Sequence, residues 1–297
     1  MSNELTTIVT PYLKGGLGNR MFVVATTLSF AWKNGYTPVF RHKSDELNLH
    51  NGRTYTDTIF QHLPYNDSLQ LTKYILFEED PETICNNFLI KVPNGTMIML
   101  KGFFQSPKLF EFEREQILNL FTYNHSIIDK FIGKTRTDFP GATLIGIHVR
   151  RGDYAEIGWS LPLKYYINAM DFMKKKFSNN LDKNAMHFDH KLLGSIENKE
   201  FSINRNIKYV IFTDDREWVQ QNFSDECLIS PILEDDLNMM VMSKMDAYII
   251  ANSTFSWWAA YLGDRSKSKI VLAPDPWNKK VVEITSLAQD HWIKIKY

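Results

Sequence analysis

An apolar run that ends in a basic turn constrains the fold of this 297-residue chain more than any other feature. Residues Thr143 to Ile147 predict a buried strand, and the turn His148-Val149-Arg150-Arg151-Gly152-Asp153-Tyr154 follows it. Such a turn puts charge at the carboxyl edge of a sheet, which is where open α/β folds bind ligands. The paired arginines suit a phosphate-bearing ligand, because guanidinium groups donate paired hydrogen bonds to phosphate oxygens. The Arg-Arg dipeptide alone is more typical of a solvated surface turn. The rest of the chain must decide between a phosphate-binding site and such a turn.

The composition narrows the class of protein. Hydrophobic residues make up 44% of the chain and charged residues 23%, which is ordinary for a globular protein. Lys plus Arg and Asp plus Glu each number 34, and this balance argues against a nucleic-acid-binding protein, which usually carries a basic excess. The cysteines, Cys85 and Cys227, lack metal-ligand spacing and fit buried thiols in a reducing compartment.

The start of the chain and its hydropathy pattern bear on location. Residues 1–7 are polar and lack the basic and apolar regions of a signal peptide. No run is long and apolar enough to span a bilayer. We therefore expect a cytoplasmic protein without a transmembrane segment, and a peripheral contact with a membrane stays open.

Strands and helices alternate along the whole chain. The first part predicts a strand at 8–12, a glycine loop at 15–19, a buried helix at 20–34 ended by Gly35, strands at 37–40 and 96–100, and a helix near 111–121. The second part predicts strands at 144–149, 209–212, 247–251 and 270–272, with helices near 163–177, 235–245 and 255–262. This alternation predicts an α/β protein with mostly parallel sheets, covered on both faces by helices.

We expect an N-terminal domain at 1–140 and a C-terminal domain at 141–297, whose last helix is free to pack back on the first domain. The polar segment 178–206 reads as an irregular insertion. His187 and His190 inside it have a loose metal-like spacing, but without further ligands they read as solvated loop residues. The Met-rich run at 239–245 predicts core filling.

The loop Gly15-Gly16-Leu17-Gly18 lets backbone amides approach a ligand at the start of a helix, which favours anions. It is not a P-loop, because no Gly-Lys-Ser/Thr follows. Gly16 and Gly18 match the first two glycines of a dinucleotide fingerprint, but Met21 occupies the third position. As an isolated signal, the loop is more typical of a tight turn without function.

Asp214 and Asp215 follow the strand predicted at 209–212. A carboxylate at such an edge can accept hydrogen bonds from a base or a ribose. Aspartate is also a good N-cap for a helix that begins at Arg216. One aspartate can serve each purpose, and the sequence does not assign them.

The segment Asn252-Ser253-Thr254-Phe255-Ser256-Trp257-Trp258 leads from a strand into a helix. Small hydroxyl residues at a helix start supply side-chain donors and unpaired backbone amides, which suit a phosphate. Helix capping by Ser253 or Thr254 explains the same residues without a ligand. The two tryptophans read as core rather than as a stacking platform. No Asp-x-Asp occurs in the chain, which argues for a site without a metal.

Five motifs carry a family resemblance when they are taken together. They are Gly15 to Phe22, Gly102 to Ser106, His148 to Tyr154, Phe212 to Asp215 and Ile250 to Trp258. In this order they resemble the α-1,2-fucosyltransferases of glycosyltransferase family 11 over nearly the whole chain. The His-Val-Arg-Arg signature is similar to one shared with α-1,6- and protein O-fucosyltransferases, so it indicates a GDP-sugar donor more than a linkage. The segment Ser253 to Trp258 is what points to the α-1,2 group.

The resemblance implies a GT-B fold, in which two Rossmann-like domains face each other across a cleft. The donor would lie mainly in the C-terminal domain and a glycan acceptor against the N-terminal one. The reaction would invert the anomeric carbon and need neither cofactor nor metal. The chain departs from the family at Arg20, where glutamine is usual, and at Val23-Val24, where a polar-aromatic pair is usual. These departures leave the identity of the acceptor open.

The resemblance also implies roles for individual residues. On the donor side Arg150 would hold the diphosphate, His148 would contact the guanosine, and Asp214 or Asp215 would accept from guanine. Asn19 would lie near the reacting diphosphate. The further residues expected at the donor are Gly16, Gly18, Arg151, Ser253, Thr254, Phe255 and Ser256. Those expected on the acceptor side are Gln105, Ser106 and Tyr154.

These residues predict a mechanism. An acceptor hydroxyl attacks the anomeric carbon of GDP-L-fucose through an oxocarbenium-like transition state, and Arg150 stabilises the charge that grows on the departing diphosphate. Asp153 is the candidate base by its place in the chain, although it can equally buttress Arg150. Three alternatives stay open: a different GDP-6-deoxyhexose donor, a non-catalytic glycan- or nucleotide-binding module, and an oxidoreductase that uses the Gly15 loop for a dinucleotide.

Overall fold

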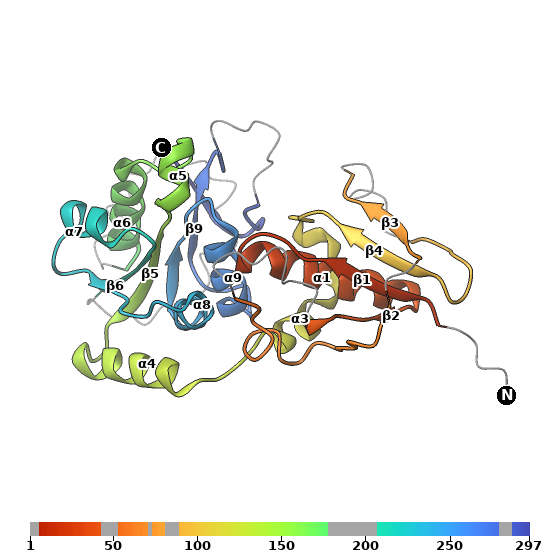
Figure 1. Ribbon diagram of the computed structural model, residues 1–297. Coiled ribbons are helices and arrows are strands. Elements are labelled where there is room, and N and C mark those ends of the chain that lie inside the picture. Colours follow the sequence, from red (N-terminus) through yellow and green to blue (C-terminus); the bar gives the residue numbers. More distant parts are fainter. Residues whose placement is uncertain (1–5, 43–52, 71–72, 81–88, 178–206, 279–286) are drawn as a thin grey trace.

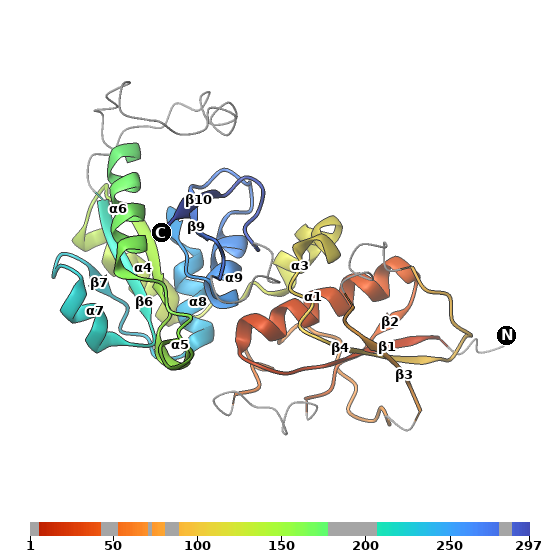
Figure 2. The same cartoon turned by 90° about the horizontal axis from the view of Figure 1, so that it is seen from above.

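A computed structural model describes residues 6–42, 53–70, 73–80, 89–177, 207–278 and 287–297. The chain forms two α/β halves, each built on its own sheet (Figure 1). Seen from above, the two sheets occupy separate lobes, and the N-terminus lies at the far end of the first lobe (Figure 2). The predicted insertion at 178–206, with His187 and His190, lies outside the described residues, as does Cys85.

The first sheet has the strand order β2-β1-β4-β3, and its neighbouring strands are all parallel. The elements before residue 141 are β1 (Ile8–Tyr12), α1 (Leu17–Asn34), β2 (Thr37–Pro38), β3 (Ile75–Glu78), β4 (Met97–Lys101), the 3-10 turns η3 (Pro107–Leu109) and η4 (Glu111–Glu113), α3 (Arg114–Leu120) and α4 (Ser126–Asp138). The glycine loop joins the carboxyl end of β1 to α1, as the sequence predicts.

The second sheet has the order β10-β9-β8-β5-β6-β7 and is also parallel throughout. Its half contains β5 (Thr143–Val149), α5 (Gly152–Ile157), α6 (Leu163–Phe177), β6 (Ile207–Thr213), α7 (Arg216–Asn222), β7 (Leu228–Ile229), α8 (Asp235–Ser243), β8 (Ala247–Ile249), α9 (Thr254–Gly263), β9 (Val271–Asp275) and β10 (Ile293–Lys296). The central strand β5 is buried over nearly its whole length, so the basic turn that follows it emerges at the carboxyl edge.

Helix α1 is buried along most of its length because its sequence is apolar on every side. Gly35 ends the helix with a φ of 69°, and its N–H donates to carbonyls of the last turn. Only glycine adopts this left-handed conformation at no steric cost, which explains the sharp stop.

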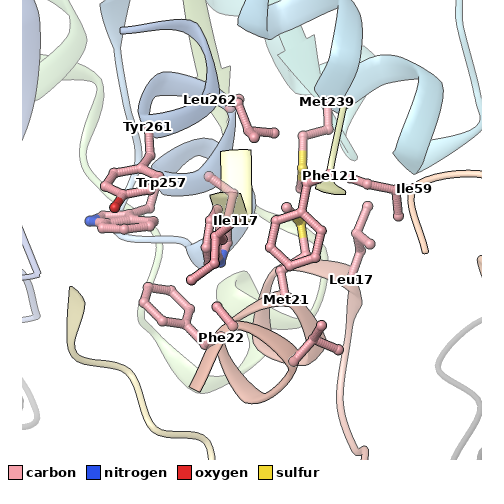
Figure 3. Close-up of a cluster of buried hydrophobic side chains, with 14 of the residues drawn as sticks. Leu17, Met21, Phe22, Ile59, Ile117, Phe121, Met239, Trp257, Tyr261 and Leu262 are labelled. Carbon is pink, nitrogen blue, oxygen red and sulfur yellow. The ribbon is translucent and has the colours of Figure 1, made fainter. Parts of the chain in front are cut away.

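The two halves share one hydrophobic core, centred on the contact between α1 and α9. The ring of Phe22 on α1 lies 4.6 Å from that of Trp257 and 5.1 Å from that of Trp258, measured between centroids. Figure 3 shows Phe22 of α1 below Trp257 and Tyr261 of α9, while Met21 lies near Phe121 on the side of Met239. Both tryptophans are fully buried, which confirms their prediction as core.

A second core lies on the other face of the second sheet, under α6 and α7. The methionines of the predicted core-filling run are all buried between that sheet and the first half: Met239, Met240, Met242 and Met245. Helix α4 precedes the predicted boundary at residue 141 yet packs against α8 of the second half. The division into 1–140 and 141–297 stays a prediction, and the last described helix, α9, packs on α1 of the first half.

Candidate active site between the two halves

A cavity of about 570 Å³ lies where the two halves meet. Its wall combines the glycine loop and the start of α1 with the carboxyl edge of the second sheet. The lining residues are Gly15 to Asn19, His148, Arg150, Asp153, Tyr154, Phe212 to Asp214, Arg216, Ile232, Leu233, Asp235, Asn238 and Ser253 to Phe255. The structure therefore brings most of the predicted site residues to a single cavity, although they come from four separate segments.

The N-termini of α1 and α9 both open into this cavity. The first amides of any helix have no intrahelical partner. In α1 the N-cap residue is Gly16, which has no side chain to accept from them. A helix N-terminus carries a partial positive charge and aims N–H groups at an anion. Ser253 caps α9 and accepts from the N–H of Phe255. The alternative role of Ser253 as a helix cap is thus confirmed.

Gly18 allows the two helix starts to approach each other. A methyl group on its Cα would lie 2.5 Å from the carbonyl carbon of Thr254 and 2.7 Å from the nitrogen of Phe255. No real side chain tolerates such a contact with backbone atoms. The glycine is therefore required for the contact between α1 and α9 in addition to any approach of a ligand.

Asn19 joins the two halves at the cavity wall. Its Oδ1 accepts from Gln105 Nε2 at 3.0 Å and from Thr254 Oγ1 at 2.9 Å. These two donors occupy the carbonyl end of the carboxamide and leave its NH₂ group as the end that can donate to a ligand. Gln105, predicted on the acceptor side, lies outside the cavity lining and instead orients Asn19.

Arg150 projects into the cavity with both ends of its guanidinium paired. Its Nη1 lies 2.7 Å from Asp214 Oδ2, and its Nη2 donates to Asp153 Oδ1 at 2.7 Å. The ring of Tyr154 lies 5.3 Å from the guanidinium carbon, in cation–π contact. Arg150 is therefore held toward the cavity by two carboxylates, of which the sequence suggested only Asp153 as a buttress.

His148 is buried against the ring of Phe255, with 4.9 Å between ring centroids. Burial, together with the nearby charge of Arg150, lowers the pKa of its imidazole to about 3. The ring is therefore neutral at physiological pH. Its Nδ1 is buried and has no hydrogen-bond partner within the described chain. A neutral ring on the cavity wall suits contact with a nucleoside better than contact with a phosphate.

Asp214 and Asp215 have different surroundings in the structure, although the sequence did not distinguish their roles. Asp215 caps α7 by accepting from the N–H of Trp218 at 3.0 Å, and it pairs with Arg151 Nε at 3.1 Å. Asp214 lines the cavity, where its Oδ1 accepts from the N–H of Arg151 at 2.8 Å. Asp214 is therefore the aspartate placed to meet a ligand.

Three further predicted residues do not reach the cavity wall. Ser256 is fully buried, and its Oγ accepts from the N–H of Ala251 at 3.2 Å, so this hydroxyl supports the turn before α9 instead of a nucleotide. Arg151 turns away toward Asp215 and lies over the ring of Trp218. Ser106 is the N-cap residue of the short turn η3. These three side chains lie outside the cavity lining, and their contact with donor or acceptor stays a prediction.

One wall of the cavity has no counterpart in the sequence-based prediction. It consists of Arg216 at the start of α7 and the segment that leads from β7 into α8, with Ile232, Leu233, Asp235 and Asn238. Leu233 is 82% exposed, which leaves an apolar side chain at the rim. Asn238 Oδ1 accepts from Ser230 Oγ at 2.7 Å. The only signal was that this segment follows a strand, and β7 is too short to be recognised.

A polar cluster fastens the loop at 53–55 to α8 across the two halves. Arg53 lies 3.3 Å from Asp235 Oδ1 and 2.9 Å from Asp236 Oδ1, and the hydroxyl of Tyr55 donates to Asp235 Oδ2. Burial raises the pKa of Tyr55 above its usual value. Arg20, the departure from the family pattern, is fully buried and donates to the carbonyls of Gly15 and Arg53. It therefore holds the glycine loop in place.

Two features bear on metals and membranes. Within the described ranges, no three His, Cys, Asp or Glu side chains come together as a metal site. No helix in that part of the chain combines the length and apolar character that a bilayer span requires. Cys227 is half-buried, and burial raises the pKa of its thiol.

Comparisons with known proteins bear on the class of enzyme. Residues 192–296 match the model of glycosyl transferase family 11. The chain is 26% identical to an alpha-1,2-colitosyltransferase of Escherichia coli, over 97% of this chain and 99% of that protein. It is 28% identical to the O-antigen biosynthesis glycosyltransferase WbnK of Escherichia coli, over 71% of this chain and 64% of that protein.

Two solved structures have a similar fold. The family 9 glycosyl transferase of Veillonella parvula aligns with 100% of this chain and 88% of that chain, at a TM-score of 0.50 and 10% identity. The fucosyltransferase NodZ of Bradyrhizobium aligns with 86% of this chain and 92% of that chain, at a TM-score of 0.49 and 14% identity. The parallel sheets of the two halves and the likeness to the family 9 structure confirm the predicted GT-B-type fold. The family match and the curated relatives support the resemblance read from the motifs: the chain is a glycosyltransferase similar to those of family 11.

Proposed function

We propose that the protein transfers L-fucose from GDP-L-fucose to the 2-hydroxyl of a galactoside-type glycan acceptor, with inversion at the anomeric carbon. The observation that carries this proposal is the convergence of Arg150, Asn19 and the N-termini of α1 and α9 on one cavity. This arrangement supplies a cation, amide donors and two helix dipoles to a diphosphate. A leaving diphosphate gains negative charge in the transition state, and fixed positive groups aimed at it lower the barrier.

The second half supplies a place for the nucleoside. Neutral His148, Asp214 and the apolar rim at Ile232 and Leu233 lie around the same cavity. A carboxylate can accept from both N1–H and the exocyclic amine of guanine, which neither adenine nor uracil can match. The acceptor would then approach from the side of the glycine loop, near Tyr154.

A second donor has support of its own. The relative aligned along nearly its whole length is named an alpha-1,2-colitosyltransferase, so a GDP-linked deoxyhexose other than fucose is the alternative substrate. A non-catalytic glycan- or nucleotide-binding module would use the same cavity without turnover. An oxidoreductase is disfavoured, because the third glycine of the dinucleotide fingerprint is Met21, which is buried in the shared core.

One assay separates these candidates. The purified protein is incubated with GDP-fucose or GDP-colitose and a panel of galactosides, and GDP release and glycan mass are followed. Acceptor-dependent GDP release with a mass gain of one deoxyhexose supports the proposal, and the preferred donor decides between the two sugars. Tight GDP binding without any product would instead support the binding module.

Nucleotide selectivity tests the assignment of Asp214. We expect GDP to bind more tightly than UDP or ADP, and Asp214→Ala to reduce that preference, because a buried group left without its partner costs roughly 1–3 kcal/mol. Asp215→Ala is the matched control: loss of a helix cap costs about 1 kcal/mol of stability and should leave selectivity unchanged. Calorimetry with three nucleoside diphosphates measures both. Equal affinity of the wild type for GDP and UDP would contradict the guanine-reading role.

Metal independence is the second expectation for this site. Helix N-termini and Arg150 are proposed to neutralise the diphosphate, so the rate of transfer should be unchanged in excess EDTA. The measurement is the initial rate with chelator and after addition of Mg²⁺ or Mn²⁺. Loss of activity in EDTA that either cation restores would refute the proposal.

A further inference from the structure

We propose that Arg150 exchanges Asp153 for the diphosphate of the donor, and that the released Asp153 then accepts the proton of the acceptor hydroxyl. This inference rests on the proposed transfer reaction. The inference adds that Asp153 is a catalytic residue, which donor binding releases from Arg150. Asp153 then both competes with the donor for Arg150 and acts as base in the complex.

Arg150 can bind a diphosphate through both ends of its guanidinium only if one of its two carboxylate partners moves away. Its Nη1 and Nη2 each lie 2.7 Å from a carboxylate oxygen, on Asp214 and Asp153 respectively. Asp153, Asp214 and Asp235 all line the cavity, against the two arginines Arg150 and Arg216. A diphosphate brought to Arg150 would meet carboxylates on both ends of the guanidinium. It gains a paired contact only if one of them moves away.

Asp153 is the partner that can leave. Its side chain is 57% exposed, against 26% for Asp214. Asp214 has a second donor in the N–H of Arg151 and lies against Gly152, whose missing Cβ would be 2.8 Å from Asp214 Oδ2. Among the described residues, the side chain of Asp153 has a hydrogen-bond partner only in Arg150. An exposed ion pair contributes little to stability, so a desolvated diphosphate outcompetes it for the guanidinium.

The other groups on the wall are poor proton acceptors. The imidazole of His148 is buried, and its pKa of about 3 makes it a weak base. Burial raises the pKa of Tyr154, so its hydroxyl stays protonated. Asp235 already accepts from Tyr55 and lies against Arg53. Arg150, Asp214 and Tyr154 are the charged and titratable groups around Asp153, and of the two carboxylates on Arg150 only Asp153 is released in the exchange.

The chemical step then balances. The acceptor oxygen forms a bond to the anomeric carbon, and the bond from that carbon to the β-phosphate oxygen breaks. The electron pair of the broken bond leaves with GDP, whose charge Arg150 now faces. The hydroxyl proton passes to the carboxylate of Asp153 and from there to solvent through its exposed side. No oxidant, metal or further reactant is needed.

The decisive experiment compares Asp153→Asn with the wild type in GDP affinity and in turnover. Asparagine keeps the size of the side chain but cannot pair with Arg150 as an anion or accept the proton as a base. We expect GDP to bind about two- to fivefold more tightly, because an exposed ion pair no longer competes. We expect kcat to fall on the order of 100-fold or more, the range of a general base. Glu156→Gln, on the exposed side of α5, is the matched control and should change neither value.

The outcomes separate this inference from the proposed function. Suppose that the wild type turns over a GDP-deoxyhexose but Asp153→Asn binds GDP no more tightly than the wild type. This result would overturn the proposed exchange at Arg150 and leave the proposed function intact. A variant that keeps near-normal kcat overturns the role as base. A wild type that turns over no GDP-sugar overturns the proposed function itself. Partial rescue of Asp153→Ala turnover by added formate would support the loss of a proton acceptor, because a purely structural defect would not respond to a small carboxylate.

Discussion

Replacement of Arg150 by alanine is expected to lower kcat/KM on the order of 100-fold or more. This corresponds to a loss of about 3 kcal/mol of transition-state stabilisation, comparable to the loss of an oxyanion donor. The guanidinium is the one arginine of the basic turn that faces the cavity, and it lies within reach of a ligand held by both helix N-termini. Arg150→Lys should rescue poorly, because a point charge cannot replace the two ends of the guanidinium. Steady-state kinetics of GDP release measure both variants.

The neighbouring arginine provides the control for this prediction. Arg151 has the same chemistry and lies next to Arg150 in the chain, but it pairs with Asp215 and packs on Trp218 outside the cavity wall. Arg151→Ala should therefore cost stability more than turnover. Near-normal turnover of Arg150→Lys, or an equal loss of turnover in Arg151→Ala with its stability intact, would show that the diphosphate role is misassigned.

Gly18→Ala is expected to disrupt the site with a single methyl group. The new Cβ would lie 2.5 Å from a backbone carbon of Thr254, and backbone atoms at a helix start cannot yield as a flexible side chain does. We expect a loss of about 1–3 kcal/mol in the free energy of unfolding, the usual cost of overpacking. Because both helix starts must shift apart, turnover should fall on the order of 100-fold, as a displacement of about 1 Å can cause.

Gly133→Ala is the matched control for Gly18. Gly133 lies within α4, and nothing lies within 4 Å of the position that its Cβ would take. Alanine there should stabilise the helix by up to about 1 kcal/mol and leave turnover unchanged. Chemical denaturation and the transfer assay, run on both variants, give the comparison. A Gly18→Ala variant as stable and active as Gly133→Ala would contradict the close contact between α1 and α9.

Much of the fold could be predicted from the sequence because hydrophobic periodicity and glycine stops are local signals. β1 and α6 have the predicted bounds, and α1 begins only three residues before its predicted start at Arg20. Strand β3 escaped prediction because it is a short edge strand whose apolar residues Ile75 and Leu76 are exposed, so it has no buried face. Helix α4 escaped because it buries only Ile128 and Thr135, too little to mark a periodic stripe.

The candidate site, too, could be predicted only in part from the sequence. Arg150, His148 and Asp214 follow strands whose carboxyl ends the sequence could place, and the structure gathers them. Which of two adjacent aspartates caps a helix depends on backbone direction, which no spacing reveals. Ser256 and Gln105 carry suitable groups, but tertiary contacts direct them to Ala251 and Asn19. The wall at Ile232 to Asn238 depends on how a two-residue strand pairs, which is a property of the whole sheet.

The aromatic contact between α1 and α9 has a consequence for how the molecule changes shape and how it unfolds. Lobes joined by a polar interface can rotate as rigid bodies, but Phe22, Trp257 and Trp258 pack together within one buried hydrophobic core. Separating the lobes would expose these rings to water, so substrates must enter by side-chain and loop rearrangement at the rim rather than by a wide hinge opening. For the same reason we expect the two lobes to unfold together in a single cooperative transition.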